Sequence, residues 1–343
     1  MNSQWKAFLA GRSAEIDDGD AVRFPGAPIE ADCALTDLSR LGVIGVTGAD
    51  TASFLQGQLT NDVRELSATH TQLSGHCSPK GRMLASFRVI QVDDRLYLQL
   101  PRTQVETVLQ RLRMFVLRAK VELSDASDDL IAIGLSGNCA EPLLATRFAA
   151  LPERANDLSR QGDLLAIRMP GPTPRFQVLG PEPAMETLWD SLSAKAAIVN
   201  PDHWGLMDIR AGIPTLYPET SDAFLPQMAN MQLIDGVSFT KGCYTGQEVV
   251  ARMQYLGKLK RRMYLAEVAA DRPPSPGDEL QSRASSSQQA TGRVVDACAV
   301  GEGRYELLAV VEIAAAEAND VRLGIDGPLL RLKEPPYGFP AES

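Results

Sequence analysis

The apolar pattern of this 343-residue chain changes near Pro273. Before it, strand-like runs alternate with helical stripes. After it, segments such as residues 291–300 (TGRVVDACAV) and 305–313 (YELLAVVEI) are separated by Gly and Pro turns and carry no helical period. Because a single hydrophobic core stops growing at roughly 250–300 residues, we predict more than one domain, the second being a small antiparallel β-barrel.

The larger first part reads as a mixture of strands and helices. Residues 71–100 contain three strand-like runs joined by short turns, which predicts an antiparallel meander. Residues 105–116 repeat apolar side chains at helical spacing and predict an amphipathic helix over that sheet. Further strands are expected within residues 130–180 and a helix at 186–195, without the regular alternation of a doubly wound sheet. The fold class is therefore α+β.

The ends of these regions are less regular. The first 30 residues lack a sustained period, so we expect folded structure to begin near Cys33. We place the two regions at residues 30–256 and 257–336.

The sequence has no run of about 18 apolar residues, and its N-terminus has no basic start followed by an apolar stretch. We therefore expect a cytoplasmic protein that does not enter a membrane.

The five cysteines lie far apart and form no CxxC pair. This spacing indicates neither a disulfide framework nor a zinc ribbon, and we expect reduced thiols. Cys33, Cys139 and Cys298 lie in apolar or strand-like runs and are expected in the core. For Cys77, which directly follows His76, the sequence does not decide between a core role and a functional one.

The charge balance bears on nucleic-acid binding. The net charge of -9 and the pI near 5 give no broad attraction to phosphates. The basic runs at residues 111–120 and 258–262 (KLKRR) are interpreted as solvated faces. No stable nucleic-acid binding is expected.

Residues 224–253 carry the most informative chemistry. Thr245 and Glu248 match the capping box that opens a helix, which we predict to run to Leu256 before Gly257. Cys243 would lie just before the positive end of that helix, with Lys241 two residues earlier. Both features favour a thiolate. The alternative is a buried, inert cysteine, the usual fate of a free thiol.

Five segments form a combined pattern: KGCYTGQE (241–248), TGAD (47–50), FLQGQLTND (54–62), HCSPKGRM (76–83) and WGLMDIRAGIP (204–214). Together they resemble the YgfZ family. The first is highly specific, and the resemblance spans most of the chain. It implies a fold like that of the glycine-cleavage aminomethyltransferase: a ring of two intertwined α+β subdomains and a C-terminal β-barrel, with a folate site near the central channel.

The resemblance also implies a function. The family is similar in role to mitochondrial 4Fe-4S assembly factors, so we expect a chain that binds tetrahydrofolate or a derivative and supports iron–sulfur client or assembly proteins. An effect on tRNA modification would be indirect, through an iron–sulfur enzyme. No resident metal is expected.

Site residues follow from the same resemblance. Cys243 is the functional thiol, with Lys241 beside it, and Trp204 is the aromatic associated with folate. Gln227, Asn230 and Asn61 have the donors and acceptors to bind the pterin edge, although turn and cap roles would suit them equally. The remaining motif residues are Gly242, Tyr244, Thr245, Gly246, Gln247 and Glu248.

Two departures from related sequences limit the expected chemistry. Leu41 replaces a second aromatic that folate binding can use, which suggests a weaker pocket. Ala85 and Ser86 stand where the aminomethyltransferase has a carboxylate, so methylene transfer is not expected. The chain is therefore interpreted as a folate-binding protein rather than an enzyme.

Two enzymatic alternatives stay open. One is a folate-dependent one-carbon transferase or demethylase that uses Asp62 or Glu248. The other is a cysteine hydrolase with Cys243 as nucleophile and His203 or His76 as base.

Overall fold

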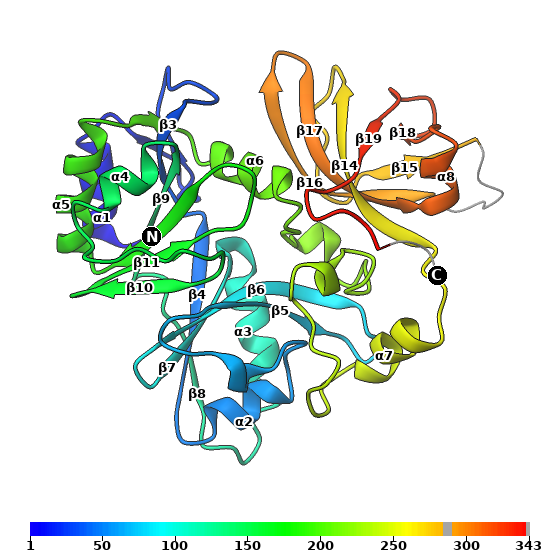
Figure 1. Cartoon of the computed structure of the whole chain (residues 1–343), viewed down its shortest axis with the longest axis horizontal. Helices are drawn as coiled ribbons and strands as arrows, with labels where there is room; N and C mark the ends of the chain where they lie inside the picture. The colour runs from blue at the N-terminus through cyan, green and yellow to red at the C-terminus, as the bar shows by residue number, and fades with distance from the viewer. Residues whose placement is uncertain (284–289, 341–343) are drawn as a thin grey trace. The chain divides into compact units, whose positions relative to one another are not determined.

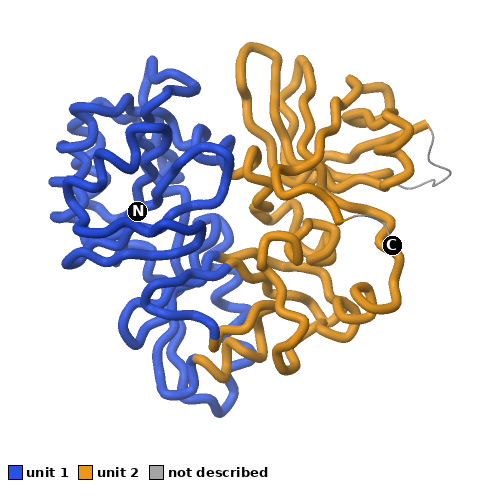
Figure 2. The backbone as a smooth tube through the Cα atoms, in the orientation of Figure 1, with its two compact units in different colours: residues 1–51, 65–72, 88–207 blue, residues 52–64, 73–87, 208–343 orange. Residues whose placement is uncertain are grey.

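The computed structural model describes residues 1–283 and 290–340, and the chain divides into two compact units (Figure 2). Unit 1 comprises residues 1–51, 65–72 and 88–207, and unit 2 comprises residues 52–64, 73–87 and 208–343. Each unit is assembled from three stretches of sequence. The predicted regions 30–256 and 257–336, by contrast, divide the chain only once along its length.

Unit 1 contains a six-stranded sheet of order β10-β11-β12-β9-β3-β13 (Figure 1). Neighbouring strands are antiparallel except β13 and β3, which are parallel. This mixture confirms the α+β class. The strands are β3 (Cys33–Asp37), β9 (Ile131–Gly137), β10 (Leu158–Gln161), β11 (Leu164–Arg168), β12 (Arg175–Gly180) and β13 (Ala197–Val199), and the accompanying helices are α1 (Ser3–Ala10), α4 (Ala140–Leu144) and α5 (Glu182–Ser193). Helix α6 (Asp202–Arg210) begins in unit 1, and its last three residues belong to unit 2.

The predicted meander is confirmed as part of a five-stranded sheet of order β5-β6-β7-β4-β8. The predicted helix is also confirmed as α3 (Val105–Arg113), which buries Val105, Val108, Leu109 and Leu112. Gly42 lets α3 approach β4 closely, because a Cβ there would lie 2.4 Å from a methyl carbon of Val105. The strands are β4 (Leu41–Thr47), β5 (Gln72–Cys77), β6 (Met83–Val92), β7 (Arg95–Pro101) and β8 (Glu122–Asp125).

The C-terminal part of unit 2 is a six-stranded antiparallel sheet, curled as a half-barrel, of order β18-β15-β16-β17-β14-β19 (Figure 1). Leu307, Ala309 and Val311 of β17 are fully buried in its hydrophobic core. A short helix, α8 (Ile313–Glu317), follows β17, where no helix had been predicted. The strands are β14 (Arg261–Ala269), β15 (Glu279–Gln281), β16 (Gly292–Gly301), β17 (Arg304–Glu312), β18 (Arg322–Leu323) and β19 (Arg331–Lys333).

The remaining elements are short. They are a two-stranded sheet of β1 (Glu15–Ile16) and β2 (Val22–Arg23), helices α2 (Thr51–Gln56) and α7 (Gln247–Tyr255), and single 3-10 turns at Val63–Glu65, Arg102–Gln104, Pro218–Thr220 and Met231–Leu233. Across residues 1–283 and 290–340, no helix combines the length and apolar character that a bilayer crossing requires.

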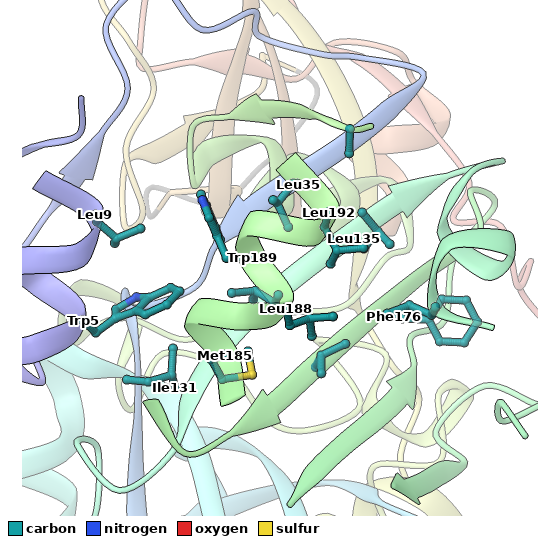
Figure 3. Close-up of a cluster of buried hydrophobic side chains, with 14 of the residues drawn as sticks. Trp5, Leu9, Leu35, Ile131, Leu135, Phe176, Met185, Leu188, Trp189 and Leu192 are labelled. Carbon is teal, nitrogen blue, oxygen red and sulfur yellow. The ribbon is translucent and has the colours of Figure 1, made fainter. Parts of the chain in front are cut away.

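The prediction that folded structure begins near Cys33 is wrong, because α1 belongs to the core of unit 1. Trp5 and Leu9 are fully buried. The indole of Trp5 packs edge-on against that of Trp189 in α5, with ring centroids 5.7 Å apart (Figure 3). Asn2 caps the helix by accepting hydrogen bonds from the amides of Gln4 and Trp5.

The prediction of five reduced thiols is wrong for two of them, Cys33 and Cys139, which were also expected in the core. Cys33 and Cys139 are half-buried and form a disulfide. The pairing of β3 with β9 explains it, since Cys33 lies opposite Gly137, two residues before Cys139. Cys77 and Cys298 are buried thiols, as a core role requires, and Cys243 is an exposed thiol.

Candidate functional site

The segment that carries Cys243 leads into α7, but the helix does not begin as predicted. Its first residue is Gln247, its N-cap is Gly246 at φ +83°, and no side chain caps it. The prediction of a capping box with Thr245 as the N-cap is therefore wrong. A Cβ on Gly246 would lie 2.4 Å from the carbonyl oxygen of Ser78, so this close backbone approach requires glycine and sets the start of the helix.

The other predicted features of α7 are partly confirmed. Val250 is buried, and the helix ends at Tyr255, one residue before the predicted end at Leu256, which is 86% exposed. Glu248 does not reach back to a cap amide. Its carboxylate instead accepts a hydrogen bond from Arg252 at 2.6 Å, one turn along the exposed face.

Lys241 is the buried anchor of this loop. Its Nζ donates to three backbone carbonyls, those of Gln56 at 2.8 Å, Leu59 at 2.5 Å and Asn61 at 2.9 Å. These bonds use all three donors of the ammonium group. The backbone amide of Thr245 adds a bond to the carbonyl of Gly57 at 3.2 Å. The loop is thereby fastened to the turn that follows α2.

Tyr244 is the second anchor. It is 7% exposed, and Lys241 Nζ lies 5.0 Å from the centroid of its ring, in the range of a cation–π contact. Gly242 and Cys243, between the two anchors, are exposed. Two buried side chains thus hold a short, outward-facing segment whose reactive atom is the Cys243 thiol.

The electrostatics of Lys241 follow from its burial. Burial lowers the pKa of Lys241 to about 8, and the nearby charge of Asp62 opposes that shift. Because the ammonium is bound to carbonyl oxygens, the structure gives Lys241 an anchoring role. Among the described residues, no contact between Lys241 and Cys243 supports the predicted influence of Lys241 on the thiol.

Asn61 belongs to the same anchor. Its side-chain amide donates to the carbonyls of Leu73 at 3.0 Å and Asp235 at 2.6 Å, and its Oδ1 accepts from the amide of Asp62 at 2.9 Å. The structure therefore brings Asn61 together with Lys241. The side-chain N–H groups of Asn61 both donate to backbone carbonyls of this protein. The alternative turn role considered for Asn61 accounts for these contacts.

Gln227 and Asn230 are brought together at a pocket of about 740 Å³ within unit 2. Asn230 adopts a left-handed conformation at φ +57° and donates to the carbonyl of Met263 and the hydroxyl of Tyr337. Gln227 donates to the carbonyl of Val250 in α7. Sequence reasoning missed the two charged residues that line this pocket, Lys258 and Arg262, because KLKRR was interpreted as a solvated face.

Trp204 lies in the core of unit 1. Its side chain is 1% exposed, and Gly134 of β9 faces the ring so closely that a Cβ would lie 2.4 Å from it. The guanidinium of Arg175 lies 5.0 Å from the ring centroid. No face of the indole is open to a ligand in this structure. In the sequence, Gly134 within an otherwise apolar strand was the signal that another group packs closely against that strand.

The two histidines of the hydrolase alternative are also buried. His203 Nε2 lies 3.0 Å from Ser136 Oγ and its Nδ1 lies 3.3 Å from the carbonyl oxygen of Ile29. His76 Nδ1 lies 3.1 Å from the carbonyl oxygen of Gln58. These contacts are those of core histidines and give the hydrolase alternative no support.

The carboxylate of Asp62 is unsuited to proton donation. Bonds from the guanidinium of Arg64 hold the pKa of Asp62 well below its usual range. Ser86, at the position of the missing carboxylate, donates to the carbonyl of Pro214 and accepts from the amide of Leu216. These contacts give the one-carbon alternative no support at Asp62 or Ser86, and its other candidate carboxylate, Glu248, is paired with Arg252.

Comparisons with known proteins agree on the fold and the family. The GCVT N-terminal domain family matches residues 27–158. The crystal structure of the glycine cleavage system aminomethyltransferase T from Bartonella henselae superposes with a TM-score of 0.76, covering 98% of both chains at 16% sequence identity. At that identity the likeness shows the fold, which confirms the predicted aminomethyltransferase-like architecture.

Two relatives are similar over most of their length. The "tRNA-modifying protein YgfZ" of Sodalis glossinidius (strain morsitans) is 32% identical, over 84% of this chain and 88% of the relative. The protein of the same name from Yersinia enterocolitica is 31% identical, over 90% of this chain and 94% of the relative. The chain therefore belongs to the YgfZ family.

Proposed function

We propose that this chain is a cytoplasmic folate-binding protein that supports the assembly or repair of iron–sulfur proteins, with Cys243 as the thiol that meets the client. The observation that carries the proposal is the exposed Cys243 held between two buried anchors, Lys241 and Tyr244. A structural cysteine gains nothing from such exposure, whereas a thiol that contacts another protein requires it.

A single exposed thiol suits a transient contact. Durable iron–sulfur clusters use four cysteines or close substitutes, so Cys243 alone would not store a cluster. It can contact a cluster intermediate or a client cysteine while the remaining ligands come from the partner. The cluster is then cargo of the client, and this chain supplies one sulfur and a fixed surface around it.

The folate part of the proposal rests on the resemblance to the YgfZ family and on the aminomethyltransferase-like fold. We propose tetrahydrofolate or a derivative as the ligand. One-carbon transfer is not part of the proposal, because Ala85 is buried and apolar and the hydroxyl of Ser86 already bonds to the backbone. The name of the relatives would then reflect an indirect effect through an iron–sulfur tRNA-modifying enzyme.

The test is to remove the gene and measure two kinds of enzyme. We expect the specific activity of a 4Fe-4S enzyme to fall several-fold, that of a cluster-free enzyme of similar abundance to stay unchanged, and the wild-type chain on a plasmid to restore the first. An equal fall in both enzymes, or no fall in the 4Fe-4S enzyme, would contradict the proposed role.

A further inference from the structure

The pocket that contains Gln227 and Asn230 has the features of a ligand site. It lies wholly within unit 2, between the segment 227–239, the end of α7 with the start of β14, and the C-terminal residues Phe339 and Pro340. Its volume of about 740 Å³ falls within the range of small-molecule sites in proteins.

Two amide oxygens of this pocket lack a donor. Gln227 is 2% exposed, and its Nε2 donates to the carbonyl of Val250 at 2.7 Å, which fixes the orientation of the amide. Its Oε1, and that of Gln232, accept no hydrogen bond from the described residues. A buried acceptor without a donor costs free energy. A ligand that donates N–H bonds would remove that cost.

Two cations of the pocket lack a counter-ion. Lys258 and Arg262 both line it, and neither forms an ion pair with another residue in the described ranges. By contrast, the adjacent Arg261 pairs with Glu312 at 3.0 Å. Two cations at one pocket that form no ion pair within the described residues favour an anionic group on the ligand.

Aromatic rings complete the site. Phe239 and Phe339 line the pocket, and the guanidinium of Arg262 lies 4.5 Å from the centroid of the Phe339 ring. The hydroxyl of Tyr337 donates to the carbonyl of Gly212 at 3.0 Å and accepts from Asn230 at 3.1 Å. These bonds anchor the chain two residues before Phe339. Flat aromatic walls suit a flat ring.

We infer that this pocket binds a flat nitrogen heterocycle that donates N–H hydrogen bonds to Gln227 and Gln232 and carries an anionic tail beside Lys258 and Arg262. Pterins with carboxylate tails and purines with phosphate tails share this chemistry. The inference depends on the proposed function only for the choice of folate as a probe. The ligand site is thus placed in unit 2 rather than at Trp204.

The experiment is calorimetric titration of the full chain with tetrahydrofolate and, separately, with ATP. The variants are Gln232→Leu, which removes an unpartnered acceptor, and Lys258→Met, with Lys260→Met as the matched control outside the pocket. We expect Kd to rise at least tenfold in the first two variants and to stay unchanged in the control. Thermal melts of all three variants should match the wild type, which separates lost binding from unfolding.

The outcomes separate this inference from the proposed function. Folate binding that weakens in both pocket variants supports both. ATP binding with the same pattern, and no folate binding, supports the pocket and removes folate from the proposed function. Folate binding that neither variant weakens overturns the pocket and leaves the function standing. No binding of either probe overturns the inference.

Discussion

Replacing Trp204 by alanine is expected to lower the free energy of unfolding by about 3–5 kcal/mol, the usual cost of truncating a buried large aromatic. The indole is 1% exposed and fills space against Gly134 and Arg175. Its removal leaves a cavity in unit 1 that the surrounding sheet cannot close. Urea denaturation followed by circular dichroism measures the change.

Tyr255→Ala is the matched control, because that ring is 67% exposed. A surface substitution of this kind should change the unfolding free energy by no more than about 0.5 kcal/mol. The burial of Trp204 would be contradicted if Trp204→Ala were as stable as the control and differed from the wild type only in ligand binding. In that case the indole would be a ligand contact, as the family resemblance implied.

Replacing Lys241 by methionine is expected to lower the unfolding free energy by about 2–3 kcal/mol, because three buried carbonyl oxygens lose their donor. The loss is smaller than the sum for three separate hydrogen bonds, because the variant no longer has to bury the charge of the Lys241 ammonium group. Amide hydrogen exchange should rise at residues 56–61 and 241–245, the two segments that Lys241 joins. Lys80→Met, at an exposed turn, should change neither quantity.

The same variant tests the titration of Lys241. Its folded pKa of about 8 is below its ordinary value of 10.5, so between these values the unfolded chain binds the extra proton. The free energy of unfolding of the wild type should therefore rise with pH, relative to Lys241→Met, from about pH 8 upward. Parallel pH profiles for the two proteins would contradict a buried ammonium at this position.

Local pattern predicted the regular elements well. The meander and α3 were found because their periods of 2 and 3.6 extend over enough residues to stand out. Helix α1 was missed because its apolar residues Trp5, Phe8 and Leu9 fill only one turn of an eight-residue helix. A sequence window long enough to detect a helical period also includes the polar residues on either side of this short helix, and these hide its apolar pattern.

The errors at the site come from contacts distant in sequence. Gly246 rather than Thr245 precedes α7 because its backbone meets Ser78, far back along the chain. Lys241 reaches carbonyls about 180 residues away, and Cys33 meets Cys139 across 106 residues. No local spacing reports such contacts. The motif KGCYTGQE identified the right loop, while the contacts defined what each of its residues does.

Cells whose sole copy of this chain is the Cys243→Ser variant provide the most direct test of the thiol's role. Serine preserves the size of an exposed side chain, so folding should be unaffected. We predict that the activity of a 4Fe-4S enzyme in these cells stays at the level of the gene deletion, whereas the buried-thiol control Cys298→Ser restores it. Full restoration by Cys243→Ser would contradict a functional thiol at this position.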